Sequence, residues 1–280
     1  MTVNNLLKSA VAELKHSDSA RLDAELLLAH VLGKDRSWLF AHAEEPLSEL
    51  HITAFQGLLT KRKAGHPVAH LVGRREFWSL DLRVNEHTLI PRPETELLVE
   101  KALEYIPNDA QWNIADLGTG SGAIALAIAH ERPLCRISAT DISANALTLA
   151  RQNAHDLGIR NVEFSEGAWL EPVNTKQFQV IVSNPPYIRQ GDPHLQTGDV
   201  RFDPVSALVS GATGLECIEY IAAHAKPLLI QDGLLMFEHG HDQASAVAEI
   251  LEQNDYHDIK TFTDLSGNAR VTRGFRPEQA

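Results

Sequence analysis

The sequence contains little cysteine, no metal-ligand spacing and no long apolar run. Its two cysteines, Cys135 and Cys217, lie far apart and form no C-x-x-C motif, so the sequence predicts neither a disulfide framework nor a thiolate zinc site. Its 14 histidines include close pairs, but no third ligand stands at a suitable spacing beside them. We therefore predict no bound metal, and we expect both cysteines to be buried apolar side chains.

Positive charge is also scarce. The chain has 25 Lys and Arg residues against 37 Asp and Glu residues, which gives a formal net charge of −12. Nucleic-acid binding draws most of its affinity from Lys and Arg meeting phosphates, so we expect no direct nucleic-acid binding. Two short basic runs, 61–63 and 74–75, are interpreted as a solvated helix end and a loop, with docking of a partner as the alternative.

Membrane and export signals are missing as well. No apolar stretch approaches the ~20 residues that a membrane-spanning helix needs. The start, Met1-Thr-Val-Asn-Asn5, lacks the basic region of a signal peptide. We therefore expect a cytoplasmic protein without membrane contact, and a monomer.

Two patterns of hydrophobic residues divide the chain. Residues 4–64 are predicted to be helical, because apolar residues such as Leu6, Leu7 and Ala10 recur at helical spacing. From Trp112 onward, strand and helix patterns alternate, which is typical of a parallel sheet covered by helices on both faces. Strands are expected at 113–116, 136–140, 162–165, 180–183, 233–238, 258–263 and 270–275.

These patterns predict an α/β chain with a helical domain over 1–74, a hairpin linker over 75–92 and a sheet domain over 93–280. The helical part shows no pattern of acid, base or nucleophile, so we interpret it as a binding or packing module. Residues 188–213 have weak periodicity, and a stretch of that length is a candidate lid.

One sequence motif follows the apolar run Val180–Val182, where a buried strand should end and where open α/β sheets place their chemistry. This motif is Asn184-Pro185-Pro186-Tyr187. The Asn184 side-chain oxygen and the Pro185 carbonyl are two acceptors that can hold both hydrogens of a planar amino group, and Tyr187 offers a flat face for stacking. The structural alternative is a rigid Pro-rich turn.

A second motif, Asp116-Leu-Gly-Thr-Gly-Ser-Gly122, is predicted to join a strand to a helix through a glycine turn. Its third glycine comes one residue too early for a dinucleotide fingerprint, which disfavours NAD. The next strand ends in Asp141, whose carboxylate can accept both hydroxyls of a ribose. We therefore predict a nucleoside ligand, with a purely structural turn and an N-capping Asp as the alternative.

Together the two motifs resemble those of class I S-adenosylmethionine-dependent methyltransferases, which have a Rossmann-like seven-stranded sheet with an antiparallel seventh strand. Four further segments are similar to the HemK/PrmC family, which methylates the glutamine side-chain nitrogen of the Gly-Gly-Gln motif in peptide-chain release factors. They are His66–Gly73, Glu76–Trp78, Leu89–Thr95 and Phe202–Leu208. In one place the chain departs from the family, since Ala168 stands where an acid is expected before Trp169.

The resemblance implies S-adenosylmethionine as cofactor, release factors as protein substrates and no metal. It implies a cofactor-binding set of Asp116, Gly118, Thr119, Gly120, Ser121, Gly122, Asp141, Trp169 and Asn184. It also implies a substrate-binding set of Asn184, Pro185, Pro186 and Tyr187, of which Asn184, Pro185 and Tyr187 are the catalytic candidates. Phe77, Trp78 and Arg92 are further candidates for a substrate channel.

Three alternatives stay open. A methyltransferase for exocyclic amino groups of DNA or RNA uses a similar tetrapeptide, but the acidic charge and the lack of a basic recognition domain argue against it. A non-catalytic S-adenosylmethionine-binding factor need not keep Asn184 and Tyr187. A small-molecule amine methyltransferase would leave the helical module without a role.

Overall fold

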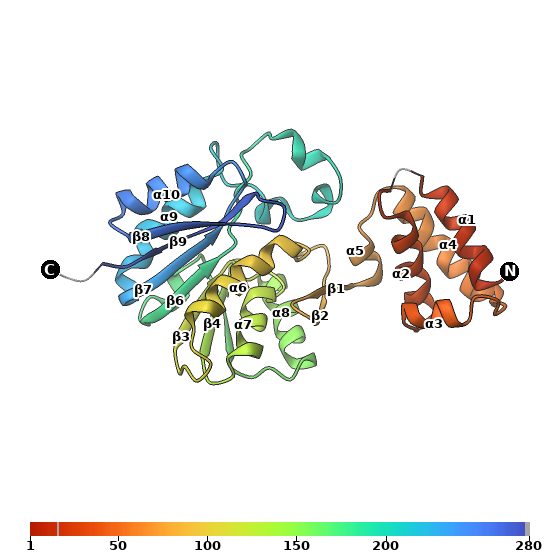
Figure 1. The fold of residues 1–280 in the computed structure, drawn as a ribbon, viewed down its shortest axis with the longest axis horizontal. Helices are drawn as coiled ribbons and strands as arrows, with labels where there is room; N and C mark the ends of the chain where they lie inside the picture. Colours follow the sequence, from red (N-terminus) through yellow and green to blue (C-terminus); the bar gives the residue numbers. More distant parts are fainter. Residues whose placement is uncertain (16, 278–280) are drawn as a thin grey trace. The chain divides into compact units, whose positions relative to one another are not determined.

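The computed structural model describes residues 1–15 and 17–277, and these form two compact units. We call Met1–Arg74 together with Gln196–Phe202 the helical unit. We call Arg75–Leu195 together with the described residues from Asp203 onward the sheet unit. Figure 1 shows the elements of both.

The helical unit is built from short amphipathic helices around one apolar cluster. Its helices are α1 (Val3–Glu13), α2 (Ala20–Leu32), α3 (Arg36–Ala41), α4 (Glu49–Lys63) and α5 (Val68–Val72). Leu27, Leu28 and Phe55 are each 0% exposed at the centre of this cluster. Ser48 caps α4, because its side chain accepts a hydrogen bond from the His51 amide at 3.3 Å.

The segment Gln196–Phe202 belongs to the helical unit although it follows the Asn184–Tyr187 motif in the sequence. Arg62 Nη1 donates to Asp199 Oδ1 at 3.4 Å, and Arg201 Nη2 donates to the Ala64 carbonyl at 3.1 Å. The region predicted as a candidate lid is therefore divided between the two units. It contains three short 3₁₀ turns, Pro193–Gln196, Val200–Phe202 and Val205–Ala207.

The sheet unit carries a seven-stranded mixed sheet with the strand order β5-β4-β3-β6-β7-β9-β8. The strands are β3 (Asn113–Leu117), β4 (Arg136–Asp141), β5 (Val162–Glu166), β6 (Phe178–Ser183), β7 (Leu229–Glu238), β8 (His257–Thr263) and β9 (Ala269–Phe275). Strand β9 runs antiparallel to both β7 and β8, whereas the pairs from β5 to β7 are parallel. The predicted α/β class and the antiparallel last strand are confirmed. A separate hairpin of β1 (Arg74–Phe77) and β2 (Leu80–Arg83) forms a two-stranded sheet.

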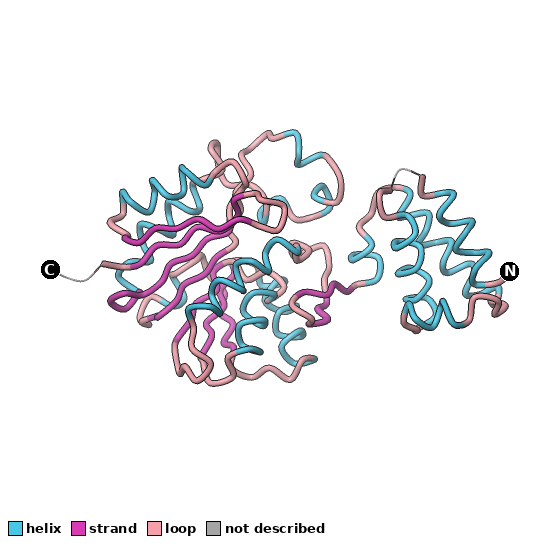
Figure 2. Tube along the Cα trace, in the orientation of Figure 1, coloured by secondary structure: helices cyan, strands magenta, loops and turns pink. Residues whose placement is uncertain are grey.

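Helices cover both faces of the main sheet (Figure 2). Alternate strand residues point to opposite faces, so Ile114 and Val180 join one buried cluster while Leu117 and Ile181 join another. The first cluster includes residues of α6 (Glu96–Tyr105), α7 (Ala123–Glu131) and α8 (Ala144–Asp156), and the second includes residues of α9 (Glu216–Ala225) and α10 (Ala244–Gln253). This layering directs the carboxyl ends of β3, β4 and β6 to one edge of the sheet.

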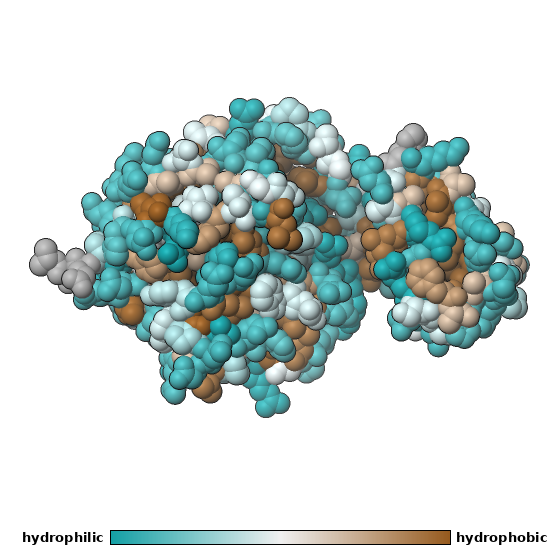
Figure 3. Space-filling model, in the orientation of Figure 1, coloured by the Kyte–Doolittle hydropathy of each residue, from teal (hydrophilic) through white to brown (hydrophobic). Residues whose placement is uncertain are grey.

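Hydrophilic residues dominate the surface seen in Figure 3. Within the described residues, no helix combines the length and the apolar character needed to cross a lipid bilayer.

Candidate functional site

A cavity of about 420 Å³ opens at the carboxyl ends of the parallel strands in the sheet unit. It brings together residues from the two motifs and from segments far apart in the sequence. Its lining comprises His87, Thr88, Leu89, Pro91, Thr95, Gly118, Thr119, Gly120, Ser121, Ala123, Ile124, Asp141, Ile142, Ser143, Ala146, Ala168, Trp169, Asn184, Pro186, Pro204, Ser206, Ala207, Val209 and Cys217. The mixture of apolar residues with hydroxyl, amide and carboxyl groups is suited to a small polar molecule with an apolar part.

The glycine turn after β3 depends on a left-handed backbone conformation that residues other than glycine rarely adopt. Gly118 has φ of 73° and Gly120 has φ of 56°. A Cβ atom on Gly118 would lie 3.1 Å from Cζ3 of Trp169, so the missing side chain lets this ring lie close to the turn. The turn therefore exposes its backbone to the cavity beside a flat aromatic group.

Asp116 lies beneath the turn and does not line the cavity. It is 0% exposed, and its Oδ2 accepts hydrogen bonds from the Thr119 hydroxyl at 2.6 Å and the Ala125 amide at 3.1 Å. Burial raises the pKa of Asp116 to about 7. In the structure this predicted cofactor residue holds the turn against the start of α7.

Asp141 ends β4 and faces the cavity. Its Oδ2 accepts from the Gly120 amide at 2.8 Å, and its Oδ1 accepts from the Ser143 amide at 2.9 Å. Burial raises the pKa of this carboxyl above its usual value. Because each carboxylate oxygen can accept more than one hydrogen bond, Asp141 can still accept hydroxyl groups from a ligand.

Trp169 lines the cavity from a strained loop position with φ of 49°. Its carbonyl accepts a hydrogen bond from the Thr140 hydroxyl at 2.7 Å, which ties the loop to β4. Ala168 lines the cavity beside it, so a methyl group occupies the place where an acid was expected. Any contact to a ligand at this place is therefore apolar.

The Asn184–Tyr187 motif follows the last residue of β6. Asn184 lines the cavity, and its Nδ2 donates to the Thr95 hydroxyl at 3.2 Å, so its Oδ1 is available to accept. Pro186 also lines the cavity, whereas Pro185 is buried. Tyr187 is not among the lining residues, and its hydroxyl donates to Glu238 Oε1 at 3.4 Å. Burial raises the pKa of this phenol far above its usual value.

The three channel candidates do not line the cavity. Phe77 is 1% exposed within the hydrophobic core, so its assignment to a substrate channel is wrong. Trp78 donates its Nε1 to Glu131 at 3.0 Å, and Arg92 pairs with the buried Asp203. These two contacts hold the hairpin and the loop at Arg92, and the channel roles of Trp78 and Arg92 stay predictions.

Thr95 and Glu238 are site residues that the sequence did not reveal. Thr95 ends the Leu89–Thr95 segment of the family resemblance, and nothing in that pattern predicts a role for its hydroxyl. A signal for Glu238 existed, because it is an acid at the end of the apolar run Leu234–Phe237, beside the strand that carries Asn184.

The two cysteines have different surroundings. Cys135 is buried as predicted, whereas Cys217 is half-buried and lines the cavity, so its assignment to the buried core is wrong. In the part of the chain that the structure describes, no group of three or more His, Cys, Asp or Glu side chains could hold a metal ion.

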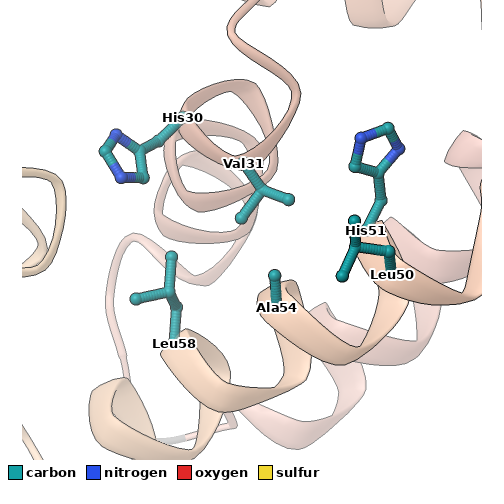
Figure 4. Close-up of a pocket in the computed structure, with 6 residues that line it drawn as sticks. All are labelled: His30, Val31, Leu50, His51, Ala54 and Leu58. Atoms are coloured by element: carbon teal, nitrogen blue, oxygen red, sulfur yellow. The ribbon is translucent and has the colours of Figure 1, made fainter.

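A shallow hollow of about 500 Å³ lies on the helical unit between α2 and α4 (Figure 4). Its lining consists of His30, Val31, Leu50, His51, Ala54 and Leu58. Its lining residues include two histidines but no carboxylate, hydroxyl or thiol group to act with them, so the candidate chemistry remains in the sheet unit.

Comparisons with known proteins cover nearly the whole chain. The family model of the PrmC N-terminal domain matches residues 5–73, and that of the methyltransferase small domain matches residues 94–202. The release factor glutamine methyltransferase of Escherichia coli (strain K12) is 46% identical over 274 residues, which covers 98% of this chain and 99% of that protein. The protein of the same name from Xylella fastidiosa (strain Temecula1) is 50% identical over 257 residues, which covers 92% and 94%.

A solved methyltransferase structure from Pyrococcus furiosus has a TM-score of 0.54 at 18% identity and covers 80% of this chain and 98% of that chain. At this identity the likeness shows a shared fold alone.

Proposed function

Since the chain belongs to the release factor glutamine methyltransferase family, we propose that it methylates the side-chain amide nitrogen of the glutamine in the Gly-Gly-Gln motif of peptide-chain release factors. The observation that carries this proposal is the placement of Asn184. It lies at the end of β6 in the cavity wall, with its Nδ2 engaged by Thr95 and its Oδ1 available as an acceptor. An amide NH₂ group presents the two hydrogens that such a site can hold.

The cavity residues fit S-adenosylmethionine, the methyl donor of this enzyme class. Asp141 can accept the two ribose hydroxyls, the Gly118–Gly120 backbone leaves room for close approach, and the Trp169 ring offers a face for the adenine. When bound, this cofactor supplies an electrophilic methyl group on a positively charged sulfur.

The protein's own contribution is to hold and orient the glutamine amide. An amide nitrogen is a weak nucleophile because its lone pair is shared with the carbonyl. Asn184 Oδ1 and the Pro185 carbonyl would accept its two hydrogens and hold them away from the amide plane, which frees the lone pair. Alignment of this kind can lower a barrier by several kcal/mol. The nitrogen becomes acidic only as the methyl group arrives, so no strong general base is required.

We further propose that the helical part, residues 1–74, recognises the release factor, with 75–92 as the hairpin linker to the catalytic domain, 93–280. A glutamine on a loop offers few contacts, so most affinity must come from a protein surface, typically about 800 Å² per partner. A fragment that starts at Arg75 should then bind S-adenosylmethionine but methylate a release factor poorly. An unchanged kcat/KM in a soluble fragment would exclude the recognition role.

Because its proposed substrates act in translation, we place the enzyme in the cytoplasm.

The direct test is incubation with S-adenosylmethionine labelled in the methyl group. The acceptors are a release factor, its variant with Ala in place of the motif glutamine, and duplex DNA. We expect label on the first alone. Label on DNA, or equal label on the two protein acceptors, would contradict the proposal.

A further inference from the structure

A buried carboxyl group lies directly beside the end of β6. Ser183 of β6 pairs with Phe237 of β7, so the next residues of these two strands, Asn184 and Glu238, occupy neighbouring positions at the cavity edge. Glu238 is 2% exposed, and its Oε2 has no hydrogen-bond partner among the described residues. Burying such a group costs free energy, so its presence here calls for a role.

Glu238 is in contact with the residues that surround Asn184. The Tyr187 hydroxyl donates to Glu238 Oε1 at 3.4 Å. The Thr95 hydroxyl, which accepts from Asn184 Nδ2, also interacts with the Glu238 carboxyl and favours its ionised form. Thr95 is 4% exposed, so bulk water cannot easily replace either partner.

The direction of these hydrogen bonds decides which end of the Asn184 amide faces the substrate. A threonine hydroxyl has a single hydrogen. If this hydrogen points to Glu238, the Thr95 oxygen accepts from Asn184 Nδ2, and Asn184 Oδ1 remains available for the substrate. If residue 238 were a donor instead, the Thr95 hydrogen could turn to Asn184 Oδ1 and favour the flipped amide. The flipped amide would present NH₂ to the NH₂ of the substrate.

We propose that Glu238 is a positioning residue for methyl transfer. By accepting from Thr95 and Tyr187, it fixes the hydrogen-bond direction that keeps Asn184 Oδ1 toward the glutamine amide. This inference rests on the proposed function and assigns it a further residue.

The charges that face Glu238 predict how this role depends on pH. The pKa of Glu238 is raised to about 7 by burial, and Glu94 acts in the same direction, whereas Thr95, Arg270 and Tyr187 oppose the rise. The carboxylate is an acceptor only, while the protonated acid can donate. The kcat of the native enzyme should therefore fall as the pH drops through about 7.

The experiment compares kcat, S-adenosylmethionine affinity and pH profile for the native enzyme, Glu238→Gln, Thr95→Val and Thr95→Ser, with an intact release factor as substrate. Glu238→Gln should lower kcat at least about tenfold, because a misplaced catalytic group can cost as much or more. It should leave cofactor affinity within a few-fold and remove the kcat change near pH 7. Thr95→Ser keeps the hydroxyl and should lose far less activity than Thr95→Val.

The double variant Glu238→Gln/Thr95→Val separates positioning from general damage. If Glu238 acts through Thr95, the second substitution should add little to the first. Fully multiplicative losses, or a kcat for Glu238→Gln within twofold of the parent, would overturn the inference. If Glu238→Gln does not fold, equal activity of Thr95→Val and Thr95→Ser would overturn it instead. A native enzyme without release factor methylation would refute the proposed function, whereas an active native enzyme with indifferent variants refutes only the role of Glu238.

Discussion

Among the described residues, both buried acids of the helical unit are ion-paired, whereas in the sheet unit Asp203 is paired with Arg92 and the other two buried acids are not. In the helical unit, Asp23 pairs with Arg62 at 2.8 Å, and Glu25 pairs with both Arg21 and Arg36. Burial alone would raise the pKa of Glu25, but the two arginines outweigh it and the pKa is lowered. These carboxyl groups are neutralised within the unit and hold helices together.

In the sheet unit, Asp116 and Glu238 form no ion pair within the described residues. Burial raises the pKa of each to about 7. Both lie at the carboxyl edge of the sheet, and each has one oxygen without a hydrogen-bond partner among the described residues. Unpaired buried acids lower stability, and their concentration at one edge is typical of a functional site. The contrast indicates that Asp23 and Glu25 serve the fold, while Asp116 and Glu238 are unpaired acids placed where the candidate site is built.

The largest expected effect tests the structural half of this contrast. Asp23→Ala removes the shorter of the two ion pairs of Arg62 together with acceptors for Ser17 and Ser19, and leaves a largely buried guanidinium with only the 3.4 Å pair to Asp199 and a hydrogen bond to the His66 carbonyl. Breaking a buried pair in this way should lower the free energy of unfolding by about 3–5 kcal/mol. Denaturant titration measures the loss. The matched control is Glu13→Ala, which breaks the exposed pair with Lys63 and should cost about 1 kcal/mol or less. Equal losses for the two variants would contradict the structural role.

The next largest effect concerns the candidate site of the sheet unit and is tested at Asn184. Asn184→Ala should lower kcat by roughly 10²-fold or more and leave S-adenosylmethionine affinity within a few-fold, since the proposed contacts of Asn184 are to the amino group that accepts the methyl. Stopped assays of methyl transfer and calorimetry measure the two quantities. Near-parental turnover would mean that the Asn184–Tyr187 motif is a structural turn.

These site residues illustrate what sequence patterns can and cannot predict. The glycine turn and the strand that precedes Asn184 follow from local rules, because apolar runs and glycines act over a few neighbouring positions. The meeting of Thr95, Asn184 and Glu238 depends on the pairing of β6 with β7 and on the turn before α6. No local pattern encodes those distances.

The start of β7 and the place of Phe77 show the same limit. The strand begins at Leu229 rather than at the expected 233, because the register with β6 shifts across an irregularity and pairs Leu229 with Phe178. Asp232, with φ of 55°, lies in this stretch. Its polar side chain interrupts the apolar pattern from which a strand is predicted. The sequence around Phe77 likewise does not indicate whether its ring faces a cavity or the hydrophobic core, where the structure places it.

A third effect tests the cofactor contact at Asp141. Asp141→Ala should weaken S-adenosylmethionine binding by about 1.5–3 kcal/mol, the usual scale of lost charge-assisted hydrogen bonds. The variant also loses the bonds to the Gly120 and Ser143 amides, so circular dichroism must show an intact fold. Unchanged affinity by calorimetry in a folded variant would remove Asp141 from the cofactor site.

The smallest effect is a dependence of stability on pH that should differ in sign between the two units. The pKa of Glu238 is about 7 in the folded chain and near the ordinary carboxyl value when unfolded. Between these values the folded state binds more protons, so the free energy of unfolding should fall as the pH rises, by up to about 1.4 kcal/mol per pH unit. Glu25, with a lowered pKa, should instead lose its contribution as the pH falls into the acid range.

The diagnostic quantity is the difference in slope between the native chain and Glu238→Gln, measured by urea unfolding from pH 5 to 8. The slope of the native chain alone also contains a contribution from His239. Burial lowers the pKa of His239, so its contribution makes the free energy of unfolding rise with pH, opposite to that of Glu238. Asp116 acts in the same direction as Glu238 and should keep part of the slope in the variant. Glu25→Gln serves as the control, since its slope in this range should match that of the native chain. If Glu238→Gln and the native chain have the same slope, Glu238 does not change its protonation on unfolding near neutral pH, and the contrast between paired and unpaired acids no longer includes it.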